Sequence, residues 1–169
     1  MIKAHDPLRK ELKQALLLYD LFGLRCLDDE NLVDHLQKYR DLIERTDKAM
    51  VDSGVVAACT ACAARTGSCC FEEMAESYGF LSLFANLLLG SEFPEEAEFP
   101  QSCRFVGQHG CTLKARHSFC LNYFCPDLKT ALGKEALDRL NTIVGEQLLA
   151  GWELERSLSR WIASALGKS

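Results

Sequence analysis

Cysteine is the residue type of this chain best suited to chemistry, and eight of the nine cysteines fall within one stretch. A thiolate is a soft ligand that suits zinc, copper(I) or an iron–sulfur cluster. Two cysteines separated by two residues, as in Cys59-x-x-Cys62, can aim both sulfurs at one metal ion. We therefore predict a metal-binding protein. Its candidate ligands are Cys59, Cys62, Cys69, Cys70, Cys103, Cys111, Cys120 and Cys125.

A disulfide framework is the other common use of so many cysteines, and it requires an oxidising compartment. The first residues, Met1 to Pro7, lead into a charged helical pattern and lack the apolar core of a signal peptide. We therefore expect a cytoplasmic protein with reduced thiols. In such a compartment metal ligation is favoured over disulfides.

The order of the cysteines carries a resemblance. The first cluster ends in a Cys-Cys doublet after Gly67, and the second runs from Cys-Arg-Phe-Val through Gly-Cys-Thr-Leu to Phe-Cys and Phe-Cys-Pro. This pattern, over about residues 59–126, resembles the YkgJ-type proteins, which are described as zinc- or iron-chelating. The resemblance implies that the eight cysteines bind zinc or iron, the latter as an ion or an iron–sulfur cluster. The chain departs from many members at residues 114–118, where they have a Tyr followed by Arg-Pro.

The resemblance does not imply a single activity, because flagellin lysine-N-methylases carry a similar cysteine region in a longer chain. One alternative is therefore an iron–sulfur-dependent enzyme, or an accessory protein, related to protein lysine methylation. Another is a protein-interaction module that zinc stabilises, with a protein partner. The sequence holds no phosphate-binding glycine loop, nucleophile elbow or HExxH motif, so it leaves catalytic residues unassigned.

The doublet Cys69-Cys70 poses a geometric problem, because adjacent side chains point in different directions in a strand or a helix. We expect the two sulfurs to have different roles, one completing the first site while the other meets the second cluster or is buried. His109 and His117 lie near enough in sequence to be substitute ligands or hydrogen-bond donors to the ligands. By contrast, Cys26 is expected to pack in the core as a small hydrophobe.

Helical periodicity flanks the cysteines on both sides. Asp6-Pro7 starts a helix that should run to about Leu24 and be well covered, because leucines recur on several of its faces. Asp28 or Asp29 caps a second helix that ends before Ser53-Gly54. His35, on that helix, and His5 lie far from any cysteine in sequence and are not expected to be ligands. Residues 1–54 should therefore form a helical hairpin.

The middle region, residues 55–126, should be less regular. Small residues around Cys59 and Cys62 predict a first ligand loop up to Gly67, and glycines before Cys111 predict a second. Between them we predict a helix over residues 71–89, with Gly79 as a point of interruption, and an acidic surface loop over 90–100. The last region, residues 127–169, should form a long helix bent near Gly145 or Gly151, with Trp152 and Trp161 in the core.

The whole prediction is a single domain over residues 1–169 that is mainly α, a helical bundle around irregular cysteine-rich metal-binding loops. The formal net charge of −5 and the lack of a basic block argue against nucleic acid as a partner. The most apolar stretch, residues 80–89, is far shorter than the roughly 20 residues that span a bilayer, which argues against a membrane partner.

Overall fold

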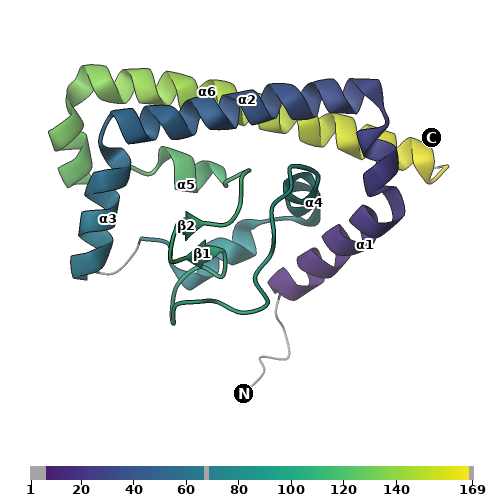
Figure 1. Ribbon diagram of the computed structural model, residues 1–169, viewed down its shortest axis with the longest axis horizontal. Coiled ribbons are helices and arrows are strands. Elements are labelled where there is room, and N and C mark those ends of the chain that lie inside the picture. The colour runs from purple at the N-terminus through teal and green to yellow at the C-terminus, as the bar shows by residue number, and fades with distance from the viewer. Residues whose placement is uncertain (1–6, 67–68, 168–169) are drawn as a thin grey trace.

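The computed structural model describes residues 7–66 and 69–167. The protein is mainly α, as predicted, and its longest helices form a frame around the cysteine region (Figure 1). The helices are α1 (Pro7–Leu27), α2 (Glu30–Asp52), α3 (Val55–Thr66), the 3₁₀ helix η1 (Glu72–Ser77), α4 (Phe80–Leu88), α5 (Ser118–Asn122) and α6 (Pro126–Ala165). Two short antiparallel strands, β1 (Val106–Gly107) and β2 (Gly110–Cys111), form a small hairpin.

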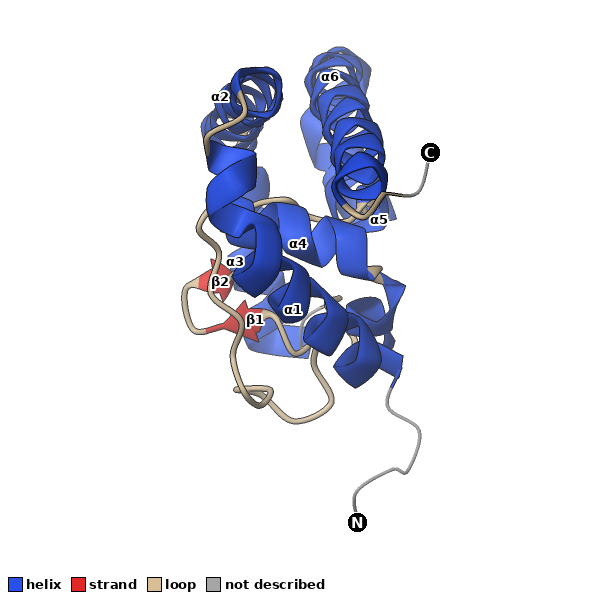
Figure 2. Ribbon diagram, turned by 90° about the vertical axis from the view of Figure 1, so that its right-hand side faces the viewer, coloured by secondary structure: helices blue, strands red, loops and turns tan. Residues whose placement is uncertain are grey.

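The frame is built on α2 and α6, which lie side by side in both views (Figures 1 and 2) and run in opposite directions in Figure 1. Asp29 caps α2 as predicted, because its Oδ1 accepts a hydrogen bond from Leu32 N at 3.0 Å. Its second oxygen, Oδ2, accepts one from Trp161 Nε1 at 3.0 Å. One carboxylate therefore both starts α2 and ties it to the far end of α6.

Two apolar clusters divide the interior. The larger one joins α1, α2, α4 and the second half of α6, and it includes the fully buried Leu83, Phe84, Leu154 and Leu158. The smaller one lies where the end of α2 and the start of α3 meet α5 and the first half of α6. Its buried members are Met50, Val55, Leu121, Phe124, Leu128, Leu140 and Val144. The smaller cluster is the apolar support beneath part of the cysteine region.

The predicted first ligand loop is wrong, because residues 55–66 form the helix α3. Gly54, with a φ of +81°, ends the preceding turn, and the alanines that we read as room for a metal are strong helix formers. Cys59 and Cys62 are therefore three residues apart on a helix, which places both sulfurs on one face. The interruption at Gly79 is confirmed, since η1 ends at Ser77 and α4 begins at Phe80.

The predicted bend of the last helix is misplaced. Gly133, with a φ of 72°, breaks α6, whereas Gly145 and Gly151 lie inside its regular part. A Cβ at Gly151 would come within 2.9 Å of the Tyr39 ring and hydroxyl, so this glycine lets α2 and α6 approach closely. Trp152 was expected in the core but is 54% exposed, while Trp161 is half-buried against Phe22.

The prediction that α1 is well covered is also wrong. Its inner face is buried through Leu8, Leu12 and Phe22, together with Cys26, which is 0% exposed and confirms its predicted core position. Its outer face carries leucines that remain largely in solvent, which are Leu16, Leu17, Leu21 and Leu24. Within residues 7–66 and 69–167, no helix is both long and apolar enough to cross a bilayer.

Candidate metal centre

Backbone pairing brings the two cysteine clusters together. Cys103 N donates a hydrogen bond to Cys70 O at 2.7 Å, and Phe71 forms an antiparallel bridge with Ser102. These residues are about thirty positions apart in sequence, so the contact is purely tertiary. It fixes the doublet of the first cluster beside the first cysteine of the second.

A buried aromatic group supports this pairing from below. The Phe105 side chain, 0% exposed, contacts Tyr78 and Phe93 with ring centroids 5.4 and 5.9 Å apart. Thr112 N donates to Phe105 O at 2.8 Å, which continues the hairpin of β1 and β2 and places Cys111 opposite Val106. The second cluster is therefore anchored in the larger apolar core.

A buried amide anchors the chain that leaves the hairpin. The Asn86 side chain donates to Ala115 O at 3.0 Å and accepts from Ala115 N at 2.9 Å. Ser91 Oγ donates to Asn86 Oδ1 and accepts from Lys114 N. Asn86 is fully buried, so these bonds satisfy an amide that would otherwise be costly to bury. They hold the segment between Cys111 and Cys120 against α4.

We divide the thiols into two groups according to which neighbouring thiols raise the pKa of each. In the first, partial burial raises the pKa of Cys59, and the thiols of Cys125, Cys62 and Cys70 raise it further. Burial likewise raises the pKa of Cys69, with Cys70, Cys59 and Cys125 adding to the effect. We name Cys59, Cys62, Cys69 and Cys125 the first thiol group.

The second thiol group comprises Cys70, Cys103, Cys111 and Cys120. Cys111 is exposed as a residue, but burial of its sulfur raises the pKa of the thiol to about 11. The thiols of Cys103 and Cys120 raise it further. Burial raises the pKa of Cys120, followed by the thiols of Cys70 and Cys103. Because Cys70 also influences Cys59 and Cys69, it lies at the junction of the two groups.

Hydrogen-bond donors oppose these shifts in the second group. Phe105 N donates to the Cys103 sulfur and Leu113 N to the Cys111 sulfur, and each bond lowers the pKa of the thiol that accepts it. The Tyr78 hydroxyl does the same for Cys120 and itself accepts from His117 N at 2.7 Å. Donors aimed at sulfur stabilise the thiolate, which is the form that binds metal.

Arg116 supplies positive charge to the second group. It lowers the pKa of both Cys111 and Cys120, and it is held by an ion pair with Asp47 on α2. The Arg116 cation thus stabilises negative sulfur in the second group. In the first group, Cys125 occupies the N-cap of α6, with Pro126 in the first turn.

The histidines have separate positions. His117 caps α5, because its Nδ1 accepts from Phe119 N at 3.2 Å, and its ring contacts that of Tyr78 with centroids 5.8 Å apart. His109 is exposed beside the hairpin. His35 is half-buried on α2, and His5 lies outside the described residues. His117 therefore lies near the thiols, where its backbone N–H holds the Tyr78 hydroxyl in place.

The thiols lie near one another but do not form a complete coordination sphere. In the described parts of the chain, no three cysteine, histidine or carboxylate side chains converge closely enough to hold one metal ion as they stand. All nine cysteines lie in those parts, and none forms a disulfide. The donor chemistry fits a soft metal, but binding requires the sulfurs to draw together.

The weak packing of α3 allows such a movement. Residues 56–62 of this helix are exposed, and only Val55 among 55–62 is buried, so α3 can move with little loss of packing.

Comparison of the chain with models of protein families, with curated proteins and with solved structures found no match. The resemblance in the cysteine pattern therefore remains a prediction. Support for a metal site comes from the electrostatic influence of the thiols on one another.

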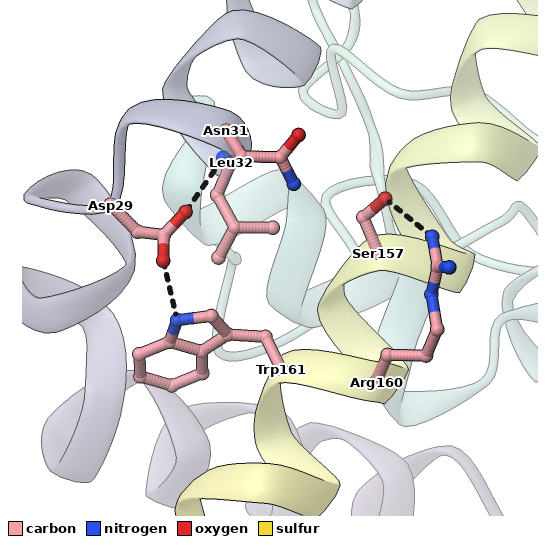
Figure 3. Close-up of a pocket in the computed structure, with 6 residues that line it drawn as sticks. All are labelled: Asp29, Asn31, Leu32, Ser157, Arg160 and Trp161. Carbon is pink, nitrogen blue, oxygen red and sulfur yellow. Dashed lines mark hydrogen bonds between the residues drawn. The ribbon is translucent and has the colours of Figure 1, made fainter.

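A hollow of about 480 Å³ lies elsewhere, between the start of α2 and the second half of α6 (Figure 3). Its lining includes Asp29 and Trp161, whose side chains are joined by the hydrogen bond that ties the two helices. Opposite them, the guanidinium of Arg160 lies 3.4 Å from Ser157 Oγ. The lining contains no cysteine, and both Asp29 oxygens already serve the fold. This hollow is part of the frame.

Sequence reasoning missed two residues of the thiol surroundings. Tyr78 lies in the stretch 71–89, which was predicted only as a helix, yet its hydroxyl joins His117 to Cys120. Arg116 was noted only as part of a departure from a family pattern. A basic residue between two candidate ligands is a signal that could have identified it, because a cation stabilises nearby thiolates.

Proposed function

We propose that this chain is a small metal-binding protein that chelates zinc or iron through cysteine thiolates, with iron bound as an ion or an iron–sulfur cluster. One observation carries the proposal. Eight thiols, drawn from segments that are far apart in sequence, lie near enough to influence one another electrostatically. Thiolates gathered in this way repel one another, and a bound cation removes that repulsion.

The two thiol groups support two four-thiolate sites. Cys59, Cys62, Cys69 and Cys125 would hold one metal centre, and Cys70, Cys103, Cys111 and Cys120 would hold the other. This division separates the adjacent residues Cys69 and Cys70, in agreement with the different directions of neighbouring side chains. Bound metal would supply charge neutralisation and, if iron, a redox centre. The chain would supply Phe105 N, Leu113 N and Tyr78 as donors that hold sulfur in the thiolate form.

Anaerobic purification tests the proposal, followed by analysis of zinc, iron and acid-labile sulfide and by an absorption spectrum. Two zinc ions per chain without visible absorption would establish two zinc sites. Iron together with at least as much acid-labile sulfide, and with charge-transfer bands in the spectrum, would establish iron–sulfur clusters. That result would also favour the enzyme alternative. The proposal fails if the anaerobic protein holds no stoichiometric metal and cannot be reconstituted with either metal.

The thiol region also presents exposed aromatic rings, which favour a second candidate function, a protein-interaction module that metal stabilises. Phe119 and Tyr123 are stacked with centroids 5.1 Å apart, and Phe71 contacts Phe119 at 6.1 Å. Each ring is more than 40% exposed although its sequence neighbours include candidate ligands. Aromatic side chains of this kind are common anchors of protein interfaces.

Metal-dependent binding of a protein partner distinguishes this second candidate function from metal chelation alone. A partner captured by the metal-loaded wild type should be lost with Tyr123→Ser and retained with Trp152→Ser, which removes an equally exposed ring from α6. Loss of the partner in both variants, or its retention in both, would show that the aromatic cluster is not the interface.

A further inference from the structure

The outer face of α1 carries a regular stripe of exposed residues. Starting at Lys10, the positions advance by four, three, four, three and four residues, which is the seven-residue repeat of helices that pack along a seam. Every member of this stripe is exposed. The members are Lys10, Gln14, Leu17, Leu21, Leu24 and Asp28.

The middle of the stripe is apolar and its ends carry opposite charges. Leu17, Leu21 and Leu24 are 55, 57 and 82% exposed, and Leu16 widens the apolar surface on one side. Lys10 lies at the start of the stripe. Asp28 lies at its end, in a turn that continues the helix, because Asp28 N donates to Leu24 O at 3.0 Å. Three consecutive seam leucines in solvent are an unusual outcome for an isolated chain.

We propose that this α1 stripe packs antiparallel against the α1 stripe of a second copy of the chain. The spacing of the stripe reads the same in both directions, so a two-fold axis between Leu17 and Leu21 aligns one copy with the other. Leu17 then meets the partner's Leu21, and Lys10 meets the partner's Asp28 at both ends. A parallel arrangement would instead oppose like charges at each end.

The location of α1 permits this contact. Its inner face packs on α4 and η1, while the helix forms one edge of the molecule (Figures 1 and 2). The stripe extends about 27 Å at 1.5 Å per residue, so two copies would form a seam of several turns. The thiol groups take no part in the seam. The proposal therefore stands apart from metal binding.

Charge makes a second copy a better occupant than a membrane surface. Helices that lie on anionic lipid carry lysine and arginine along the polar face beside the apolar stripe. Here the basic residues of α1 lie toward its two ends, whereas Asp20 lies beside the central leucines and Asp28 ends the stripe, in a chain of net charge −5. The basic residues are Arg9, Lys10, Lys13 and Arg25. Near the proposed two-fold axis Asp20 meets its own copy, so it opposes the dimer and offers a way to strengthen it.

The test is sedimentation equilibrium of the full metal-loaded chain over a range of concentrations. The wild type should form a dimer, and Leu21→Glu should raise the dissociation constant about 100-fold or more, since two apolar contacts are lost and two charges are buried. The matched control is Leu149→Glu, which changes a leucine on α6 that is 56% exposed and should leave the dimer intact. Circular dichroism and metal content should match the wild type in both variants.

Charge exchange tests the antiparallel register. Lys10→Glu should weaken the dimer about tenfold, because it places a glutamate opposite the partner's Asp28. The substitution should not destabilise α1 itself, since a glutamate is favourable near the start of a helix. The double variant Lys10→Glu/Asp28→Lys should restore wild-type affinity to within a few-fold. Asp20→Asn should tighten the dimer, because it removes a like-charge pair.

Four outcomes would overturn the proposal. The wild type could stay monomeric at every soluble concentration, or Leu21→Glu could leave a wild-type dimer unchanged. A monomer that binds vesicles of anionic phospholipid, with loss of binding in Leu21→Glu, would assign the stripe to a membrane surface. A dimer that Lys10→Glu leaves unaffected would exclude the antiparallel register.

Discussion

The helical frame of α1, α2, α4 and α6 and the thiol region of residues 55–62, 69–78 and 101–125 use cysteine in opposite ways. In the frame, Cys26 is 0% exposed among apolar side chains, and burial raises its pKa to about 11. In the thiol region, sulfurs gather beside backbone N–H groups, a tyrosine and an arginine. The same side chain is therefore a packing unit in one region and a candidate ligand in the other. Its surroundings make the difference.

The two regions also differ in what holds them in place. The frame buries many large apolar side chains, each of which stabilises the fold by about 1.5–3 kcal/mol. The thiol region rests on the smaller cluster, on the part of the larger one that holds Cys103 and Phe105, and on single contacts such as Cys103 N to Cys70 O. We expect metal to stabilise the thiol region far more than the frame, because short irregular segments have few other interactions to offset their loss of entropy.

Metal removal should produce the largest difference between the regions. After chelation, hydrogen exchange at residues 55–62 and 101–125 should accelerate at least about tenfold, which corresponds to a loss of about 1.4 kcal/mol or more in local stability. Residues 30–52 of α2 should retain most of their protection. Equal acceleration in both regions, or none in the thiol region, would remove the basis for treating them as separate.

Substitution of the doublet should sharpen the division between the thiol groups. Cys70→Ser should lose the metal of the second group and weaken that of the first, because Cys70 is close to both. Cys69→Ser should lose only the metal of the first. Metal stoichiometry and release rates measure the difference. Matching losses in both variants would show that the doublet bridges a single centre.

A comparison of Cys26→Ala with Cys62→Ala tests the two uses of cysteine directly. Cys26→Ala should keep the full metal content and lower the free energy of unfolding by about 1–2 kcal/mol, the cost of a small core cavity. Cys62→Ala should lose metal from the first group. Metal loss with Cys26→Ala would place Cys26 in a site, contrary to its burial in the frame.

Arg116→Gln should act on the second thiol group alone. Without this cation the pKa of Cys111 and of Cys120 should rise further, so metal binding to that group should weaken at neutral pH and recover partly as the pH rises. Arg45→Gln is the matched control, because Arg45 also pairs with an acid, Glu146, but on the frame. Competition with a metal indicator from pH 6 to 9 would measure the effect, and equal changes in both variants would count against it.

Alkaline pH should reveal the ionisation of Cys26 in the metal-free protein. Since burial raises the pKa of Cys26 from 9.0 to about 11, the unfolded thiol ionises first, and folded-state stability should fall as the pH rises through this range. Below pH 9.0 the contribution of Cys26 is fully present. Cys26→Ala should flatten the decline measured by denaturant unfolding. An unchanged slope would show that Cys26 ionises as readily in the folded chain.

Several features could be determined from the sequence because they depend on a few adjacent residues. Asp29 caps α2, Pro7 begins α1 and Gly79 separates η1 from α4, each through steric limits or hydrogen bonds of the local backbone. The candidate ligands could also be named, because thiolate chemistry belongs to the residue type. Misreading α3 as a loop came from giving the alanines a role near metal when their helix propensity decided the structure.

Only the tertiary structure decided how the thiols divide and which surfaces stay open. The hydrogen bond from Cys103 N to Cys70 O joins segments that no local pattern relates, so the position of Cys70 between the groups could not be derived from spacing. Likewise, periodicity shows that α1 has apolar residues on several faces, but not which faces other helices cover. Those outcomes depend on packing between distant elements, whereas helix ends depend on neighbours within one turn.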